Sequence, residues 1–536
     1  MRRRNAIFLL PAIAVVALAF WFTRSREPRY HGHKLGYWVK DLQNTNWVEA
    51  LQAARTIGSN AIPFLLEDLQ AQDSEWKLKF NDWLYRTFDW KSQYTTAENR
   101  HEIALGGFFF LGAKGESAIA KLTSLMEDKD DSIRRAAMSA LGWIGTETAA
   151  RLLIQALTNQ NTAIRGDAAF TLRLLGGKAS NAIPALLLCL DDKEPYVSER
   201  AASALGQFGF RPDTIVPALI RKLDDPDRRV QSAAFWALSS FGTNALSALS
   251  VLQQLSDQSP EPRRHARIAS ALVRIQCVIH EGAIVRGPRR EKKIALVFTG
   301  HEFAEGAETI LNNLTNHHAR ASFFLTGTFL DNPKLKTLVE RIVREGHYLG
   351  PHSDKHLLYC AWDASTKTLL TRPEFHADLM NNAQKVDSFV QDQPRYFLPP
   401  YEHHNIEIAN WTRNLFRTLI NYTPGTRSNA DYTSEADKNF VSSQKIFDSI
   451  VKHEQEDPNG LNGFILLLHI GVGPNRADKF HNRFAELLDY LAAKGYQFVR
   501  VDELLEPKDE GIPNPNRNRN PNRGAYPTPN GTFQRR

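Results

Sequence analysis

The chain has 536 residues and a mass of 60.6 kDa, enough for roughly three or four domains of about 150 residues each. Its 42% hydrophobic and 23% charged residues exclude a disordered chain, a collagen, a coiled coil and a protein with many membrane spans. Of the net charge of +7, the first 34 residues carry +6 and the last 30 carry +4, which leaves −3 for the body. We therefore predict no nucleic-acid partner.

The first predicted element is a membrane segment. Seventeen uncharged residues, Ala6 to Phe22, follow Arg2-Arg3-Arg4-Asn5, and at ~1.5 Å per residue they span a bilayer core with some thinning. A cleaved signal peptide is the alternative, because Ala17-Leu18-Ala19 has the A-x-A form. Phe20-Trp21-Phe22 favours an interfacial anchor. Residues 1–34 are predicted to be a signal-anchor or transmembrane segment, and both interpretations export the rest of the chain.

A repeat of 31 to 33 residues follows. Four segments share an alanine-rich pattern that ends in glycine: Ala136–Gly145, Ala168–Gly176, Ala201–Gly209 and Ala233–Gly242. Pro184 and Pro217 are expected in the first turn of a preceding helix, where the missing N–H costs nothing, and the glycines are expected to end the second helix. This pattern resembles HEAT or HEAT-like PBS-lyase repeats. It predicts an α-solenoid over residues 35–280 that binds an unknown protein partner and performs no chemistry.

A tryptophan-rich insert interrupts the repeat. An earlier copy lies at Ala53–Leu66, and Trp76, Trp83 and Trp90 follow it. These tryptophans either stack on sugars or cap the solenoid core. The prediction favours the cap, because terminal repeats are atypical and need one.

From about residue 288, short strands alternate with helices. Strands are predicted at 293–298, 321–325, 395–398, 418–422, 463–468 and 496–501, and helices at 307–318, 335–345, 375–390 and 479–494. This pattern predicts an α/β domain over residues 288–506, with a parallel sheet or barrel that binds ligands at the carboxyl ends of its strands. Residues 507–536, rich in Pro, Asn, Arg and Gly, are predicted to be a disordered basic tail.

Histidines gather in this domain, which holds twelve of the seventeen. His301 follows the first strand, His352 and His356 form the sequence H-S-D-K-H, and His469 ends the Leu-rich strand at 464–468. Two imidazoles at i and i+4 reach one metal ion from a single helical turn. Taken singly, such a pair is more often a surface coincidence, and a histidine at a strand end is often a core residue. The complete set favours a metal site.

Five motifs in order resemble the polysaccharide deacetylase or NodB-homology domain, carbohydrate esterase family 4, over about residues 290–505. They are Ile294–Phe298, Ala321–Gly327, Gly346–His356, Phe397–Tyr401 and Ile465–His469. The resemblance implies a distorted (β/α) barrel of NodB type. It also implies a divalent metal ion, usually zinc, that polarises an acetyl carbonyl and activates water.

The same resemblance assigns roles to residues. His352 and His356 would bind the metal ion, and His469 would protonate the leaving group as general acid. The backbone N–H of Tyr401 would help to hold the oxyanion, and Leu467 would line the acetyl pocket. The implied substrate is an acetylated polysaccharide or a peptidoglycan-type glycan.

The first motif departs from the family pattern T-F-D-D. Without a gap, Thr299 and Gly300 replace both aspartates; with a two-residue slip, His301 and Glu302 occupy the two positions. Either His301 or Glu302 then completes a three-ligand site, and His301 is the predicted third ligand.

The base and the fourth motif are also altered. Glu302 and Glu402, which follows the Pro-Pro-Tyr motif, are the candidate general bases, and Leu398 replaces an arginine that would orient the base. The fourth motif is loosely present at 424–432, where Arg427 and Asp431 are candidates for its supporting ion pair.

Three functions remain open. The first is a membrane-anchored, metal-dependent deacetylase of the bacterial cell envelope, acting on the extracytoplasmic side with the repeats as a scaffold. The second is a catalytically inactive carbohydrate-binding protein. The third is a deacylase of peptide or small-molecule amides, because an insert at 357–371, with Trp362, would reshape the groove.

Overall fold

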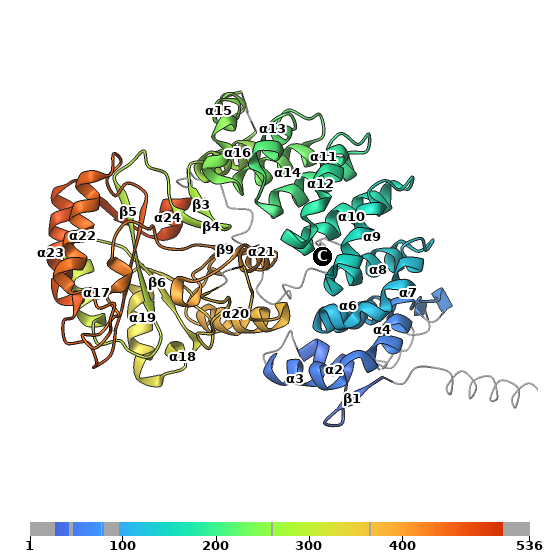
Figure 1. Cartoon of the computed structure of the whole chain (residues 1–536), viewed down its shortest axis with the longest axis horizontal. Helices are drawn as coiled ribbons and strands as arrows, with labels where there is room; N and C mark the ends of the chain where they lie inside the picture. Colours follow the sequence, from blue (N-terminus) through green and yellow to red (C-terminus); the bar gives the residue numbers. More distant parts are fainter. Residues whose placement is uncertain are drawn as a thin grey trace, which may run out of the picture. The chain divides into compact units, whose positions relative to one another are not determined.

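A computed structural model describes residues 27–41, 47–76, 78–79, 96–258, 261–363 and 366–506 (Figure 1). The apolar segment at 6–22, Trp83, Trp90 and the tail at 507–536 lie outside the described residues, so the predictions for them stay predictions. One described helical stretch, Ala97–Leu125, is long and apolar enough to cross a membrane, and 56% of its 18-residue apolar window is buried inside the protein. The described residues divide at Leu152/Leu153 into two compact units.

The first unit is mostly helical, and its helices pack against one another through buried side chains that are mainly alanine, leucine, isoleucine and phenylalanine. Its elements are β1 (Arg29–Tyr30), β2 (His33–Lys34), α2 (Leu35–Asp41), α3 (Trp47–Ile57), η1 (Gly58–Ala61), α4 (Ile62–Leu69), α6 (Ala97–Leu111), η2 (Gly112–Ala118), α7 (Ile119–Leu125) and α8 (Asp131–Ile144). Helix α9 (Glu147–Ala156) crosses the boundary between the units.

The second unit begins with further helical repeats. They comprise α10 (Thr162–Leu175), η3 (Gly176–Ala182), α11 (Ile183–Cys189), α12 (Pro195–Phe208), α13 (Pro212–Ile220), α14 (Arg228–Ser239), η4 (Gly242–Ala248), α15 (Leu249–Asp257) and α16 (Pro262–Arg274). The four closing glycines all have a positive φ, between 53° and 69°, which confirms that they follow helix ends. Pro184 lies in the first turn of α11, but Pro217 lies inside α13, because that helix already begins at Pro212.

The α/β part of this unit contains a curled half-barrel. Its strands are β3 (Val278–His280), β4 (Ala283–Arg286), β5 (Lys293–Gly300), β6 (Ser322–Leu325), β7 (Tyr348–Pro351), β8 (Tyr396–Phe397), β9 (Thr418–Leu419), β10 (Phe464–His469) and β11 (Gln497–Val499). The order is β3-β4-β10-β5-β6-β7, with β11 paired to β5 and a separate β8-β9 pair. Strands β10, β5, β6 and β7 are parallel, as predicted.

The β8-β9 pair is hydrogen-bonded to both sides of the curled sheet. The Leu398 N–H, just after β8, donates to the Pro351 carbonyl on β7 (3.4 Å), and the Asn421 N–H, just after β9, donates to the Ile284 carbonyl on β4 (2.9 Å). The carboxyl ends of β5, β7, β8 and β10 therefore open toward one end of the domain, where loops can carry a site.

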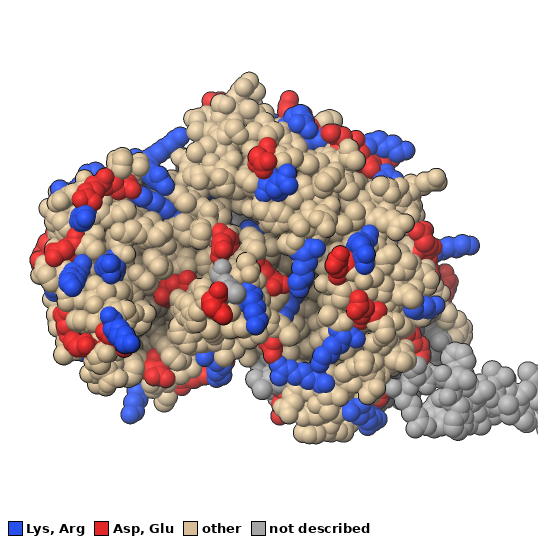
Figure 2. All heavy atoms as spheres, viewed as in Figure 1, with Lys and Arg blue, Asp and Glu red and all other residues tan. Residues whose placement is uncertain are grey.

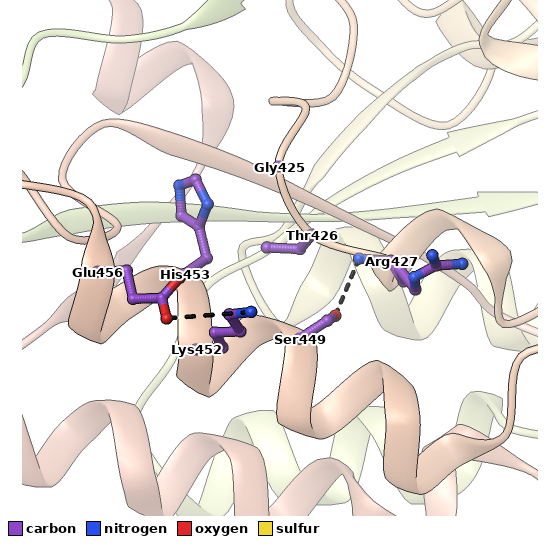
Figure 3. Close-up of a pocket in the computed structure, with 7 residues that line it drawn as sticks. All are labelled: Gly425, Thr426, Arg427, Ser449, Lys452, His453 and Glu456. Carbon is purple, nitrogen blue, oxygen red and sulfur yellow. Dashed lines mark hydrogen bonds and ion pairs between the residues drawn. The ribbon is translucent and has the colours of Figure 1, made fainter.

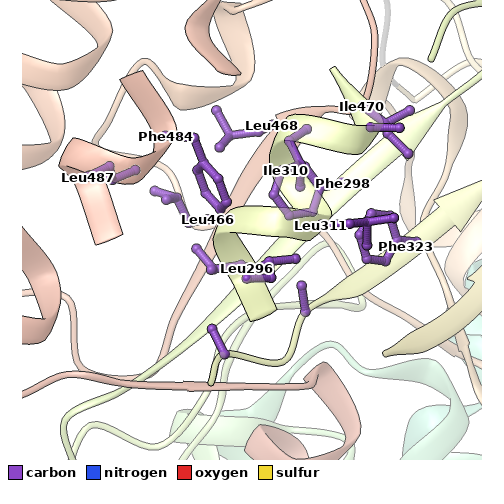
Figure 4. Packing of buried hydrophobic residues seen from close by; sticks show 14 of the residues in the cluster. Leu296, Phe298, Ile310, Leu311, Phe323, Leu466, Leu468, Ile470, Phe484 and Leu487 are labelled. Atoms are coloured by element: carbon purple, nitrogen blue, oxygen red, sulfur yellow. The ribbon is translucent and has the colours of Figure 1, made fainter. Parts of the chain in front are cut away.

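Helices cover the outer face of the sheet (Figure 1). They are α17 (Ala307–Asn316), α18 (Gly327–Leu330), η5 (Pro333–Leu335), α19 (Lys336–Arg344), α20 (Arg372–Asp387), α22 (Ser443–Glu456), η8 (Phe480–Arg483) and α23 (Phe484–Ala493). The other helices of this part are η6 (Pro400–Glu402), α21 (Ile406–Asn414), η7 (Ser428–Ala430) and α24 (Val501–Leu505). Leu296 and Phe298 of β5 pack with Leu466 of β10 against side chains of α17 and α23, among them Ile310 and Phe484 (Figure 4). The alternate residues Val297 and Leu467 face a second, inner cluster. Both faces of these strands are apolar, which is why their sequences are continuous hydrophobic runs.

Strand β7 lies in a segment that the sequence presents as a turn. Gly350 and Pro351 weaken its intrinsic preference for a strand, yet β7 pairs in parallel with β6 over four residues. A Cβ at Gly350 would lie 2.6 Å from the Phe324 ring. A glycine is therefore needed at position 350 because β6 and β7 approach closely there, and not because of its local conformational preference.

Within the second unit, the helical repeats pack directly on the α/β domain. The side-chain amide of Gln207 (α12) donates to the Asn410 carbonyl (α21) at 3.1 Å, and Arg274 (α16) donates to the Tyr396 hydroxyl (β8) at 3.2 Å. Strand β3, inside the range predicted for the solenoid, belongs to the sheet. Experiments on the α/β domain should therefore keep the repeats that support it.

Candidate active site

The predicted site residues lie at the carboxyl ends of the curled strands. His301 follows β5, His352 and His356 follow β7, Tyr401 and Glu402 follow β8, and His469 ends β10. On the face drawn in Figure 2, acidic and basic side chains are interspersed, and neither sign forms a continuous field.

His352 is buried and held from two directions. Its Nδ1 donates to the Leu398 carbonyl (2.9 Å), and its backbone N–H donates to the Asn382 Oδ1 (2.6 Å). Asn382 in turn donates from Nδ2 to the Leu325 carbonyl (3.1 Å). Because a carbonyl only accepts, Nδ1 carries the proton and Nε2 keeps its lone pair, which is the arrangement of a metal-ligating histidine.

The H-S-D-K-H segment is not helical. Ser353 and His356 have φ values of 77° and 55°. The prediction that a helical turn carries this histidine pair is therefore wrong. The loop is held instead by Asp354, whose carboxylate pairs with Lys385 at 2.6 Å. The rings of His352 and His356 still meet, with centroids 5.3 Å apart. Tertiary contacts, not helix geometry, bring the pair together.

His301 lies beside this pair. Its ring stacks on that of His356 with centroids 4.6 Å apart, and its Nδ1 lies 3.1 Å from the Thr326 hydroxyl. Burial lowers the pKa of His301 and lowers that of His356 to about 4. Burial also lowers the pKa of His352 strongly. The three imidazoles are therefore neutral at pH 7.

This donor set suits a divalent metal ion by its chemistry, because neutral imidazoles are preferred ligands of zinc. Among the described residues, however, no three His, Cys, Asp or Glu side chains already stand in the geometry of a metal site. The rings of His301 and His356 are stacked instead, with an interplanar angle of 16°.

Asp431 and His469 form a close ion pair. Nδ1 of His469 lies 2.6 Å from Oδ1 of Asp431, and the His469 backbone N–H donates to Oδ2 at 2.9 Å. Burial alone would lower the pKa of His469, but Asp431, assisted by Glu402, holds this pKa above its usual value. Asp431 therefore favours the protonated imidazole, the form from which Nε2 can donate a proton.

A second carboxyl group, that of Glu402, interacts electrostatically with both members of this pair. The pKa of Glu402 is raised to about 7, chiefly by burial; His469 opposes this shift and Asp431 adds to it. Tyr401 and Glu402 both have a positive φ, 56° and 52°, a conformation that costs a non-glycine residue about 1–3 kcal/mol. The Asn421 side chain donates to the Glu402 carbonyl at 2.7 Å and supports this turn.

Thr299 and Gly300, which occupy the two aspartate positions if the first motif is aligned without a gap, are both buried. The Thr299 hydroxyl has no hydrogen-bond partner among the described residues. A Cβ at Gly300 would lie 2.7 Å from Ile470 and 2.9 Å from Leu325. The space that an aspartate at position 300 would need is therefore filled by apolar side chains.

Gly300→Ala is expected to destabilise the protein by about 1–3 kcal/mol, because the added methyl group overpacks this contact. Gly177→Ala is the control, since nothing lies within 4 Å of its Cβ position, and it should change stability by less than about 0.5 kcal/mol. Thermal unfolding of the two variants measures the difference. Equal melting temperatures would contradict the packing described here.

Two predicted residues lie apart from the catalytic groups. Arg427 lines a depression of about 460 Å³ between its own loop and α22, together with Ser449, Lys452 and His453 (Figure 3). The Arg427 backbone N–H donates to the Ser449 hydroxyl at 2.9 Å, whereas Asp431 contacts His469. Leu467 is fully buried in the inner apolar cluster beneath the site.

Comparison with known families agrees with this architecture. Residues 103–173 and 183–273 match the model of HEAT repeats, and residues 286–418 match the model of polysaccharide deacetylase. The chain carries HEAT repeats followed by a polysaccharide deacetylase domain. The motif resemblance predicted from the sequence is thereby confirmed.

Known relatives match the deacetylase domain at low identity. A peptidoglycan-N-acetylglucosamine deacetylase of Bacillus cereus is 27% identical over 223 residues, which covers 41% of this chain and 92% of the relative. A peptidoglycan N-acetylglucosamine deacetylase of known crystal structure is 20% identical. The match covers 41% of this chain and 91% of that protein, with a TM-score of 0.33. A family 4 pseudoenzyme of Bacillus anthracis is 18% identical. That match covers 43% of this chain and 70% of the pseudoenzyme, with a TM-score of 0.34.

The sequence reasoning missed the residues that position the site. Asn382, Asn421 and Thr326 of the deacetylase domain hold His352, Glu402 and His301 through hydrogen bonds. Each positioning residue lies at least 19 residues from its partner along the chain. Nothing local marks them, since a polar residue on a helix or loop is usually a surface residue.

Proposed function

We propose that this chain is a metal-dependent hydrolase that removes N- or O-acetyl groups from a cell-envelope glycan. The observation that carries the proposal is the Asp431–His469 pair beside Glu402, a carboxyl whose pKa lies at about 7. A proton donor beside a proton acceptor is what hydrolysis of an acetyl group requires.

Each group has a defined task. His301, His352 and His356 would hold a divalent ion, zinc in most of the family, which polarises the acetyl carbonyl and acidifies a water molecule. Glu402 takes a proton from the water as the water oxygen bonds to the carbonyl carbon. His469 then gives its proton to the leaving nitrogen or oxygen as that bond breaks and acetate departs. The Tyr401 N–H donates to the carbonyl oxygen as negative charge develops there.

Glu302 is the weaker candidate for the base. Its side chain is 60% exposed and lies 3.7 Å from His301, so water screens it and its neighbour competes for it. Glu402 interacts electrostatically with the proton donor His469, and its pKa of about 7 suits a base at neutral pH.

The names of the relatives suggest the substrate. The Bacillus cereus relative is a peptidoglycan-N-acetylglucosamine deacetylase, so we propose N-acetylated peptidoglycan as the first substrate to assay. This substrate places the domain in the cell envelope. The segment at 6–22 would serve as the membrane anchor and the HEAT repeats as a surface for a protein partner.

His352→Ala in the full chain is expected to remove most bound zinc and to lower acetate release from peptidoglycan by at least about tenfold, since a ligand and its hydrogen-bonded support are lost together. His318→Ala is the matched control, because His318 is exposed. Metal content by mass spectrometry and acetate by enzymatic assay measure both effects. Unchanged zinc and acetate in His352→Ala would refute the metal assignment.

A second function is favoured by Thr299 and Gly300. With no aspartate at the end of β5, the domain would bind glycan without hydrolysing it. Retention of the full chain on peptidoglycan in the presence of a chelator, with no acetate released by the zinc-loaded protein, would support this alternative.

A further inference from the structure

Exposed apolar side chains in the deacetylase domain gather at one end. Among its described residues, six of seven exposed large hydrophobic side chains follow the carboxyl end of a strand: Phe303, Leu357, Trp362, Leu369, Tyr401 and Tyr432. The seventh, Phe416, precedes β9 at its amino end. A concentration of exposed apolar surface around a site marks the place where a ligand covers it.

Trp362 is the most exposed of the six, at 63%. Its indole stacks on the His403 ring with centroids 4.4 Å apart and an interplanar angle of 18°. His403 is itself fixed, because its Nε2 lies 3.1 Å from the Ala361 carbonyl. The two rings form a supported flat surface with an exposed indole.

This surface connects to the catalytic groups through neighbouring rings. The Trp362 and Tyr401 centroids are 6.0 Å apart, and those of Tyr401 and His356 are 4.4 Å apart. Trp362 therefore lies within about 10.4 Å of a predicted metal ligand. Tyr432, 52% exposed, contacts the His469 ring at 5.4 Å and provides a second exposed ring beside the proton donor.

We propose that the Trp362–His403 pair is a sugar-binding subsite that stacks on a pyranose ring next to the acetylated sugar. This inference rests on the proposed function, because it assumes that a glycan lies across the catalytic groups. A pyranose ring has a flat C–H face with hydroxyl groups around its edge. The C–H face can therefore pack on the apolar face of the indole, while the hydroxyl groups at its edge stay in contact with water.

The stacking contact should contribute to affinity and not to the chemical step. A residue that binds substrate and transition state equally changes KM and leaves kcat unaltered. Trp362→Ala is therefore expected to raise KM for an oligosaccharide. Hydrolysis of a small acetate ester, which is too short to reach Trp362, should stay unchanged.

The experiment titrates the full chain with a β-1,4-linked N-acetylglucosamine tetrasaccharide by calorimetry. Trp362→Ala is expected to weaken binding by about tenfold, the loss of one aromatic contact. Trp362→Phe keeps a ring and should lose no more than about threefold. Phe416→Ala, a change of an exposed aromatic side chain at the other end of the domain, should bind as the wild type does. Thermal unfolding of each variant checks that the fold is retained.

The outcomes separate this subsite from the proposed activity. If the wild type releases no acetate but Trp362→Ala still weakens tetrasaccharide binding, the hydrolase proposal fails and the subsite is upheld. Equal affinity of Trp362→Ala and the wild type overturns the subsite, whatever the activity. Absence of tetrasaccharide binding by the wild type overturns it as well.

Discussion

His469→Ala is expected to lower acetate release from peptidoglycan by about 10²- to 10⁴-fold, the usual contribution of a general acid. The leaving amine cannot depart as an anion, and Asp431 holds the protonated imidazole that would supply the proton. Glycan affinity should change little, since His469 acts on the transition state. Single-turnover acetate assays and calorimetry on the same preparation measure the two quantities.

Asp431→Asn is the companion change for this test. It keeps the size of the side chain but removes the charge that raises the pKa of His469. Without that charge, the effect of burial would lower the pKa of His469. Because His469 would then lose its proton at a lower pH, activity would also be lost at a lower pH than in the wild type. His318→Ala is the control histidine. If His469→Ala kept half of the wild-type rate, His469 would not be the proton donor.

The second large effect concerns pH and Glu402. A protonated carboxyl cannot accept a proton, so kcat/KM is expected to rise as pH increases through the Glu402 pKa of about 7. Activity should fall again at higher pH as His469, whose pKa is raised, loses its proton. Glu402→Gln is expected to remove the rising limb and to lower kcat by about 10²- to 10⁴-fold.

Glu302→Gln is the matched control for this profile. It removes the other candidate base and should leave the rising limb in place, because Glu302 is exposed and lies against His301. The reverse result, a loss of the limb in Glu302→Gln and its retention in Glu402→Gln, would assign the base to Glu302. Full pH profiles of both variants distinguish the two assignments.

Local periodicity made the architecture predictable. The repeat glycines, the alternation of strands and helices, and the hydrophobic runs of β5, β6 and β10 all follow from short-range rules that the structure obeys. Strands β3, β4 and β7 did not follow from those rules. They are short, and β7 contains Gly350 and Pro351, so only pairing with their neighbours makes them strands.

The candidate site divides in the same way. The sequence by itself determined which chemical groups are present: the histidines, Glu302, Glu402, Asp431, and a first motif without its two aspartates. Motif order carried that information, and for His301 and His469 the hydrophobic runs of β5 and β10 also located the strand ends that these histidines follow.

Only the tertiary structure decided how these groups act. It paired Asp431 with His469 and separated Arg427 from both. It also filled the space beside Gly300 with Ile470 and Leu325. Pairing depends on contacts across the sheet and between loops, and pKa values depend on burial. Both arise from the packing of residues far apart in the chain, which no local pattern encodes.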